Sequence, residues 1–433
     1  MKAGKYTAAL LLLGVGTALI ADMVTGGNVT GVLIKWWPVV LIALGAEYMI
    51  VSVVKRDSEK SIGIAFGSLF MAAEISIAAI AATNAANLAF LRDMGIHLGN
   101  ITIGNVSFAD ENGRRFEMDP VRTTVDESEG TIYLSNLVGD VTIRTGDVKE
   151  IELKGTVYVH KSVDNAEEIA RQSEIRIEHL GDRLEIVADG REYRAHGIKQ
   201  KPRINLAVTI PRDLDQNWHI SVTSGKVDAA GITVRDRLTA TTLNGSLELA
   251  DITGNVAGDT ANGAIVIRNI RGDASADTSN GRITITNVDG RVSADTAQGW
   301  VELRDIGGDV SVTTMNGNVA MERIGGNVKT ETANGSIQLI EAGGAVKATS
   351  ANGDITVRTA RLAGDFDLES TNGKITVQLP EDASFEVEGE TMRGGIETDF
   401  PLDAGKREIR GTVNGGTYEI EIDTNSDIAI NVY

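Results

Sequence analysis

Residues 260–285, TANGAIVIRNIRGDASADTSNGRITI, decide the fold, because their Asn-Gly pair returns after 18 residues. The pair or a close variant recurs at this spacing at Asn244, Asn262, Asn280, Gln298, Asn316, Asn334 and Asn352, and after 20 residues at Asn372. A second glycine keeps step with it at Gly254, Gly272, Gly290, Gly308, Gly326, Gly344 and Gly364. Two turns in each period predict two strands in each repeat.

Apolar and polar side chains alternate between the turns, which is the pattern of strands with one buried face. Aliphatic columns run from Leu247 to Ile375 and from Leu249 to Val377 after the Asn-Gly pairs. After the second glycine, one column runs from Val256 to Phe366 and a column of small residues begins at Gly258. The threonines of the motif, Thr260, Thr278, Thr296, Thr314 and Thr332, are also expected inside. A thin, continuous interior follows from this pattern.

Asn-Gly is also a strong signal for antiparallel hairpins, so a meander is the alternative fold. A meander gives no reason for two kinds of turn to alternate, and here one turn is always Asn-Gly or Gln-Gly while the other has glycine without asparagine before it. We therefore predict an all-β parallel β-solenoid of about eight 18-residue, two-strand coils, in which the Asn side chains stack and hydrogen-bond.

The flanking residues define the predicted domain limits. Regular coils are expected over residues 221–378, an N-terminal β-rich cap with one short helix over 89–220, and C-terminal capping coils over 379–433. The helix is predicted from Asp164 to Gln172, with Asp164 as N-cap and Glu167 three residues on. Residues 411–433 are expected to close the end of the rod, since an open end is an aggregation-prone edge.

Residues 1–88 are predicted to be a transmembrane anchor with spans at about 7–24, 36–54 and 62–82, the last two of which are long enough to cross a bilayer as helices. A signal peptide is the alternative for the first apolar run. Glu47 and Glu74 fall inside the second and third spans, where they either have a function or share a proton between helices.

Basic residues set the orientation of the anchor. Lys2 and Lys5 precede the first span, and Lys55, Arg56 and Lys60 lie between the second and third. Basic loops stay in the cytoplasm, which predicts a multi-pass cell-membrane protein with its C-terminal solenoid on the extracytoplasmic side.

Composition excludes several functions. The net charge of −19 argues against nucleic-acid binding, which needs a basic face. The absence of cysteine removes disulfides, thiolate metal sites and cysteine nucleophiles. The 48 glycines accompany only 6 prolines, so glycine serves turns rather than disorder.

A family resemblance rests on the Thr-x-Asn-Gly-x-Ile coils, the Val208–Leu214 stretch and the Gly411–Ile420 run. Together they resemble the bacterial "putative adhesin" β-solenoid family over roughly residues 120–433. Trp36–Gly45 looks like the Trp-Pro motif of Lia-type transmembrane hairpins in envelope-stress proteins of Gram-positive bacteria. The resemblance implies an envelope solenoid without catalytic residues to carry over.

No chemical motif emerges from the sequence. The five histidines, His97, His160, His179, His196 and His219, are scattered, and no nucleophile elbow or phosphate loop occurs. We expect no enzyme activity, no cofactor and no catalytic or metal site.

Three outward features remain to be explained. Asp259, Asp277 and Asp295 are expected to stack on the surface, either as solvated carboxylates or around a bound cation. Arg268, Arg304 and Arg358 share an outward column like the basic residues of polysaccharide lyases, and Trp300 is a lone exposed aromatic.

The main functional hypothesis is a membrane-anchored, adhesin-like envelope protein that displays its solenoid to bind wall polymer or another surface. The alternative is an accessory or regulatory protein of the cell-envelope stress response that docks a membrane sensor protein. A polysaccharide-acting β-helix enzyme is a minor third possibility.

Overall fold

The computed structural model describes residues 106–433, except residues 109–112, 127 and 196–197. The chain divides into two units, Met1–Asn105 and Val106–Tyr433, and only the second falls within the described residues. The three predicted spans, with Glu47 and Glu74, lie outside them. The described residues contain no helix with the length and apolar character that a membrane crossing needs.

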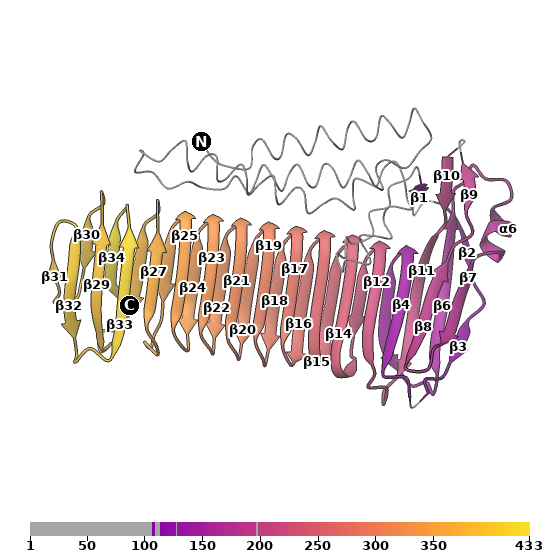
Figure 1. Ribbon diagram of the computed structural model, residues 1–433, viewed down its shortest axis with the longest axis horizontal. Coiled ribbons are helices and arrows are strands. Elements are labelled where there is room, and N and C mark those ends of the chain that lie inside the picture. Colours follow the sequence, from indigo (N-terminus) through magenta and orange to yellow (C-terminus); the bar gives the residue numbers. More distant parts are fainter. Residues whose placement is uncertain (1–105, 109–112, 127, 196–197) are drawn as a thin grey trace, which may run out of the picture. The chain divides into compact units, whose positions relative to one another are not determined.

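Two faces of parallel strands, called here the first and the second sheet, run through the regular part of the second unit (Figure 1), and continuous pairing joins them into one 31-stranded sheet. The first sheet holds the strands that run into the Asn-Gly turns, and the second sheet holds those that leave them. In the regular part, the first sheet contains β12 (Asn217–Ser224), most of β14 (Thr233–Asn244), β17 (Ala274–Asn280), β19 (Val292–Gln298), β21 (Val310–Asn316), β23 (Val328–Asn334), β25 (Val346–Asn352) and β27 (Phe366–Ser370).

The second sheet contains β13 (Val227–Ala230), β16 (Ile265–Arg271), β18 (Ile283–Val288), β20 (Val301–Ile306), β22 (Val319–Ile324), β24 (Ile337–Ala342), β26 (Ile355–Arg358) and β28 (Ile375–Leu379). One long strand, β15 (Leu247–Asn262), bends from the second sheet into the first, because its halves pair with β16 and β17 respectively.

The register confirms the predicted stacking. Asn262 in β15 is the partner of Asn280 in β17, and Ile265 in β16 is the partner of Ile283 in β18, with both pairs in parallel strands. Residues 18 apart therefore lie side by side, and the antiparallel meander is ruled out. The prediction of an all-β parallel solenoid with two strands in each coil is correct.

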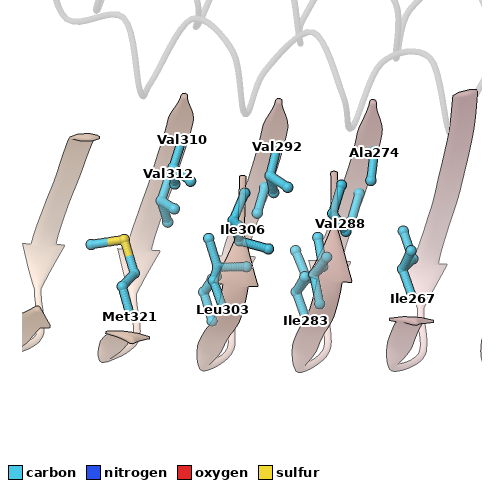
Figure 2. Packing of buried hydrophobic residues seen from close by; sticks show 14 of the residues in the cluster. Ile267, Ala274, Ile283, Val288, Val292, Leu303, Ile306, Val310, Val312 and Met321 are labelled. Carbon is cyan, nitrogen blue, oxygen red and sulfur yellow. The ribbon is translucent and has the colours of Figure 1, made fainter. Parts of the chain in front are cut away.

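The interior is a stack of aliphatic columns (Figure 2). The predicted columns are buried; Ile265, Ile267 and Ile283 have no exposed surface. The structure adds one column that the sequence did not predict, at or near the ends of the second sheet's strands: Ile252, Ile270, Val288, Ile306, Ile324 and Ala342. Every turn of the chain thus contributes to one continuous core.

The motif threonines are buried as predicted, but their hydroxyls do not bond to one another. Thr260 Oγ1 donates to the carbonyl oxygen of Gly245 at 3.0 Å, and Thr278 Oγ1 donates to that of Gly263 at 3.2 Å. Thr296 and Thr332 donate in the same way, so these hydroxyls tie their strands to the Asn-Gly turn of the preceding coil. The buried Thr314 hydroxyl has no hydrogen-bond partner among the described residues.

The glycine of the Asn-Gly pair is required by close stacking rather than by a left-handed backbone. A Cβ atom on Gly281 would lie 1.8 Å from the carbonyl oxygen of Gly263, and one on Gly299 would lie 1.8 Å from that of Gly281. No side chain fits between backbones that approach so closely.

The second turn works differently from the prediction, which placed it at the second glycine. The left-handed residue of this turn is a non-glycine residue at the end of each second-sheet strand: Asp251, Asn269, Asn287, Asp305, Arg323 and Glu341, with φ between 55° and 62°. The Asn269 side-chain amide donates to Asp251 Oδ1 at 2.7 Å, and Asn287 donates to Asn269 Oδ1 at 2.9 Å. Stacked side chains compensate for the backbone conformation that L-residues disfavour.

The N-terminal part contains β2 (Arg114–Glu117), β3 (Val121–Thr123), β4 (Thr131–Val138), β5 (Val141–Gly146), β6 (Ile151–Val159), β7 (Glu174–His179), β8 (Arg183–Asp189) and β11 (Arg203–Pro211), with β1 (Val106–Phe108), β9 (Tyr193–Ala195) and β10 (Ile198–Lys201) in a separate small sheet. β4 and β5 form an irregular first coil, because they pair in parallel with β12 and β13. Antiparallel strands β6 and β7 lie farther out.

The short helix α6 spans Ala166–Arg171, inside the predicted range. The predicted N-cap is wrong, since the cap position is Asn165 and no side chain caps the helix. Burial of Ala166, Ile169 and Ala170 against β6 holds the helix in place instead.

The C-terminal part contains β29 (Phe385–Thr391), β30 (Ile396–Thr398), β31 (Asp403–Ala404), β32 (Glu408–Val413), β33 (Tyr418–Thr424) and β34 (Ile428–Val432). The prediction that residues 411–433 close the rod is wrong. β33 pairs with both β27 and β29, so the last stretch of the chain lies inside the stack. The antiparallel pair of β29 and β32 lies beyond it.

Candidate binding surface

The Asn-Gly turns line up along one edge of the solenoid and carry a ladder of side-chain amides. Asn262 Nδ2 donates to Asn244 Oδ1 at 3.0 Å, and Asn280 donates to Asn262 in the same way. The ladder resumes where Asn334 donates to Asn316 at 2.8 Å and continues to Asn372. Between the two ladder segments stands Gln298, whose side chain is exposed.

The largest exposed apolar side chains of the repeat gather at this interruption. Trp300, two residues after Gln298, is 56 % exposed, and Met315 in the next coil is 59 % exposed. The guanidinium of Arg282 lies 5.3 Å from the centre of the Trp300 ring and stacks on it. The edge therefore presents an aromatic ring, a thioether and an amide outside the ladder.

This edge differs from the rest of the surface in its charge. In six successive coils the residue after the Asn-Gly or Gln-Gly pair is Ser246, Ala264, Arg282, Trp300, Asn318 and Ser336, of which Arg282 alone is charged. Asp354 and Lys374 follow the pairs of the next two coils. In a chain of net charge −19, an edge of amides and hydroxyls is a distinct surface.

The three predicted carboxylates do stack on the outer surface of the first sheet. Asp259, Asp277 and Asp295 are register partners in successive coils. Desolvation raises the pKa of Asp259; desolvation and then the charges of Asp259 and Asp295 raise the pKa of Asp277. This row is therefore a site of electrostatic strain.

Replacing Asp277 with asparagine should increase the free energy of unfolding at neutral pH, by about 0.5 kcal/mol for an exposed like-charge row. When folding raises the pKa of a carboxyl, the folded protein loses stability as the pH rises from the unfolded-state pKa to the folded-state pKa. The stability gained by the Asp277→Asn variant should therefore vanish at pH values below the unfolded-state pKa. Denaturation at pH 7 and in acid measures it. Destabilisation of the variant at pH 7 would instead indicate a cation held by the row.

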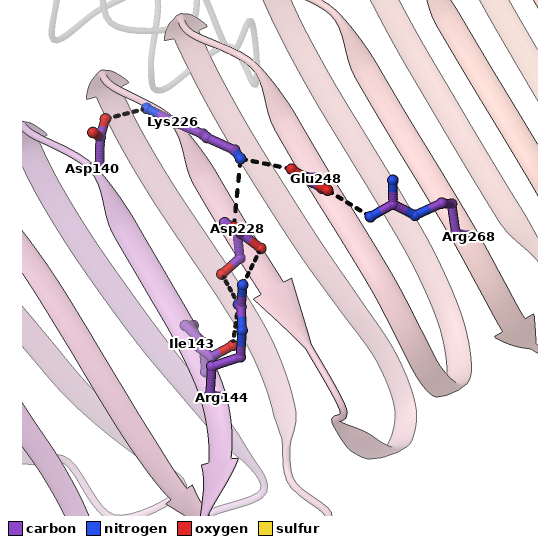
Figure 3. A network of polar contacts seen from close by, with 7 residues as sticks. All are labelled: Asp140, Ile143, Arg144, Lys226, Asp228, Glu248 and Arg268. Carbon is purple, nitrogen blue, oxygen red and sulfur yellow. Dashed lines mark hydrogen bonds and ion pairs between the residues drawn. The ribbon is translucent and has the colours of Figure 1, made fainter.

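The outer face of the second sheet is held by ion pairs (Figure 3). Lys226 Nζ lies 2.6 Å from Glu248 Oε2, and Arg268 Nη2 lies 2.5 Å from Glu248 Oε1. The hydrogen bond from Lys226 lowers the pKa of Glu248 the most, and the hydrogen bond from Arg268 lowers it further. The same Lys226–Glu248 hydrogen bond raises the pKa of Lys226. Arg144 and Asp228 extend the network at 2.8 Å.

The arginine column that suggested a lyase is present, but its members have partners. Arg268 is bound to Glu248, and Arg304 lies 2.9 Å from Glu322. Arg358 donates to the Tyr433 hydroxyl at 2.8 Å and lies over its ring. The first two contacts join neighbouring coils, and the third reaches past β28 from β26 to the residue after β34.

A groove of about 830 Å³ follows the outer surface of the first sheet near the second turns. Its floor includes a row of small hydroxyls, Ser275, Ser293 and Ser311, followed by Lys329 and Lys347. Charges of both signs line it, which contrasts with the Asn-Gly edge.

One cluster was invisible in the sequence, because its members are about 50 residues apart. His179 Nδ1 lies 2.8 Å from Glu129 Oε1 and 4.0 Å from Asp126 Oδ2, a grouping that could hold a metal ion. The buried Glu129 carboxylate also accepts the Asp126 backbone N–H at 2.9 Å. These contacts tie the turn before β4 to the end of β7.

The stacked coils define the class, a parallel β-solenoid, and comparison with known proteins then gives the family. A family model described as Toastrack DUF4097 matches residues 131–431, so the chain belongs to that family. A model of the LiaF transmembrane domain matches residues 7–99. The chain is therefore a membrane-associated envelope protein with an adhesin-like solenoid.

The chain also matches solved structures at low identity and low TM-score. A "putative cell adhesion protein" from Clostridium sporogenes is 14% identical and covers 74% of this chain and 100% of its own, with a TM-score of 0.18. A "putative lipid binding protein" from Parabacteroides distasonis is 12% identical over 75% of this chain and 98% of its own, with a TM-score of 0.28. A "putative adhesin" from Bacteroides fragilis is 13% identical and covers 76% of this chain and 100% of its own, with a TM-score of 0.21. No curated protein matches the chain.

Proposed function

We propose that this protein is a non-catalytic, membrane-tethered binding protein whose solenoid takes up uncharged polysaccharide of the cell envelope along the Asn-Gly edge. The exposed Trp300, beside an amide that the ladder does not use, is the observation that carries the proposal. Aromatic rings present a flat apolar face to sugar rings, while amides and hydroxyls bond to sugar hydroxyls.

The charge of the chain selects the kind of polymer. An acidic protein repels anionic wall polymers, and the stretch of its Asn-Gly edge from Ser246 to Ser336 offers little positive charge beyond Arg282 to attract them. Neutral glycan chains meet no such barrier, and rows of equivalent amides one coil apart suit a polymer that itself repeats.

The test is sedimentation of the full chain with purified neutral glycan and, separately, with anionic wall polymer. We expect the protein to sediment with the neutral glycan and not with the anionic polymer. Trp300→Ala should weaken glycan binding roughly 10-fold, which corresponds to a loss of about 1.4 kcal/mol of binding free energy. Lys329→Ala, in the groove on the first sheet, is the matched control and should bind like the parent chain.

Three results would contradict the proposal. Binding that survives Trp300→Ala but is lost with Lys329→Ala would move the site to the groove. Preference for the anionic polymer would remove the charge argument. Shortened glycan in the supernatant would favour the polysaccharide-acting enzyme, which is otherwise the least supported function.

A role in envelope-stress signalling is the second candidate, favoured by the match of residues 7–99 to the LiaF transmembrane domain. In this version the predicted spans contact a membrane sensor protein and the solenoid responds to the state of the wall. Photocrosslinkers at Glu47 and Glu74 should then capture a membrane protein. Stress signalling that is unchanged after deletion of the solenoid would remove this role.

The predicted topology belongs to the same proposal. Three spans with the solenoid on the extracytoplasmic side would place the Asn-Gly edge where wall polymer is. Protease added to intact cells should digest residues beyond about 90, and full protection of those residues would contradict this orientation.

A further inference from the structure

Three side chains in the N-terminal part of the described unit bring metal-binding atoms together. His179 ends β7, while Asp126 and Glu129 lie between β3 and β4. One imidazole nitrogen of His179 and one oxygen of each carboxylate all lie within 4.8 Å of one another. None of these residues belongs to the Asn-Gly edge, so the cluster is separate from the proposed glycan site.

The Glu129 carboxylate is buried without a lysine or arginine partner. Its side chain is 1 % exposed, and among the residues that the structure describes neither Glu129 nor Asp126 forms an ion pair with a lysine or an arginine. Glu129 Oε2 accepts the Asp126 backbone N–H at 2.9 Å, and Oε1 faces His179 Nδ1 at 2.8 Å. Buried carboxylates in proteins are paired or bind metal ions. What lies between Oε1 and Nδ1 therefore decides how Glu129 is compensated.

The hydrogen bonds of Thr123 determine which nitrogen of His179 carries a hydrogen. The Thr123 hydroxyl has one hydrogen and donates it to the Thr124 carbonyl oxygen at 3.1 Å. At 3.3 Å from His179 Nε2, the hydroxyl oxygen therefore accepts the Nε2–H. The neutral ring then has its lone pair on Nδ1, where it faces a lone pair of Glu129 Oε1. Two lone pairs at 2.8 Å repel each other, so a positive centre, either a proton or a metal ion, has to lie between these atoms.

We propose that His179 Nδ1, Glu129 Oε1 and Asp126 Oδ2 bind one divalent transition-metal ion, with Zn²⁺ as the preferred ion. A divalent ion neutralises both carboxylates, whereas a proton on Nδ1 supplies one positive charge for the two. An imidazole nitrogen with carboxylate oxygens is a donor set of Zn²⁺ sites, while Mg²⁺ and Ca²⁺ prefer oxygen ligands alone.

Small movements complete the coordination. Ligand atoms about 2.0–2.1 Å from a tetrahedral Zn²⁺ lie roughly 3.3 Å from one another. The Nδ1–Oε1 distance of 2.8 Å has to open slightly, and the 4.0 Å between His179 Nδ1 and Asp126 Oδ2 has to close. The Asp126 side chain is 68 % exposed and can rotate toward the ion. The bound ion ties the turn before β4 to the end of β7 and keeps a coordination position for water.

Calorimetric titration with ZnCl₂ tests the site on the full-length chain, purified in detergent and stripped of metal with a chelator. We expect the chain to bind a single Zn²⁺ and not to bind Mg²⁺ at the same concentrations. His179→Asn and Asp126→Asn should each weaken Zn²⁺ binding at least about 10-fold, and both replaced side chains are exposed enough for the variants to fold. Asp182→Asn, an exposed carboxylate between β7 and β8, is the matched control and should bind like the parent chain.

Two results would overturn the proposal. Absence of Zn²⁺ binding by the parent chain would mean that a proton alone joins His179 to Glu129. Zn²⁺ binding that either His179→Asn or Asp126→Asn leaves unchanged would place the ion elsewhere on this acidic protein.

Discussion

Replacing Gly281 with alanine is expected to destabilise the solenoid by roughly 3 kcal/mol, the upper range for forcing extra atoms into a packed site. The new Cβ would lie 1.8 Å from the Gly263 carbonyl oxygen, which is backbone and cannot rotate away. Either the two coils separate or the hydrogen bond from the Gly281 N–H to the Gln298 carbonyl, 3.0 Å long, is lost. Denaturant unfolding monitored by circular dichroism measures the effect.

Gly130→Ala is the matched control for this prediction. A Cβ at Gly130 meets no atom within 4 Å, and its φ lies outside the left-handed region. The variant should unfold within about 0.5 kcal/mol of the parent. Equal stabilities of the Gly281 and Gly130 variants would mean that the Asn-Gly turns are not stacked as closely as described.

Deleting residues 281–298 should leave a folded solenoid that is one coil shorter. The deletion joins Asn280 to Gly299, so the Asn-Gly turn, both sheets and every column remain in register. Because each coil contacts only its neighbours, the loss is limited to one coil and one interface. Thermal unfolding should remain cooperative.

Deleting only residues 281–289 should abolish that cooperative unfolding. It joins Asn280 to Gly290, and the local pattern barely changes, since Arg291-Val292-Ser293 replaces Arg282-Ile283-Thr284. However, it removes β18 from the second sheet and leaves β16 and β20 without the strand between them. If this half-coil deletion melted like the full-coil deletion, local pattern rather than stacking would be holding the structure.

The repeat made the stacking predictable. The 18-residue spacing fixes the register between coils, and the alternation of apolar and polar residues fixes which side chains point into the core. The left-handed column at Asp251 and Asn269 was missed, since its members vary from aspartate to arginine and no residue type marks them. The place of β33 was also missed, because the apolar pattern is equally satisfied by a coil at the end or inside the stack.

The candidate site was predictable only in part. Trp300 was identified as an exposed aromatic from its place outside the alternating columns. The interruption of the ladder beside it needed coordinates, although Gln298 is visible as the one exception in its column. The contacts of His179 with Glu129 join distant segments, which spacing cannot reveal.

Disulfide formation between paired cysteines tests the stacked-coil architecture most directly. Ser275 and Ser293 are outward-facing partners in β17 and β19, whereas Ser275 would face Thr286 if Asn280-Gly281 were the loop of a hairpin. We predict that the Ser275→Cys and Ser293→Cys pair closes a disulfide and that the Ser275→Cys and Thr286→Cys pair does not. Closure of the second pair and not the first would contradict the account.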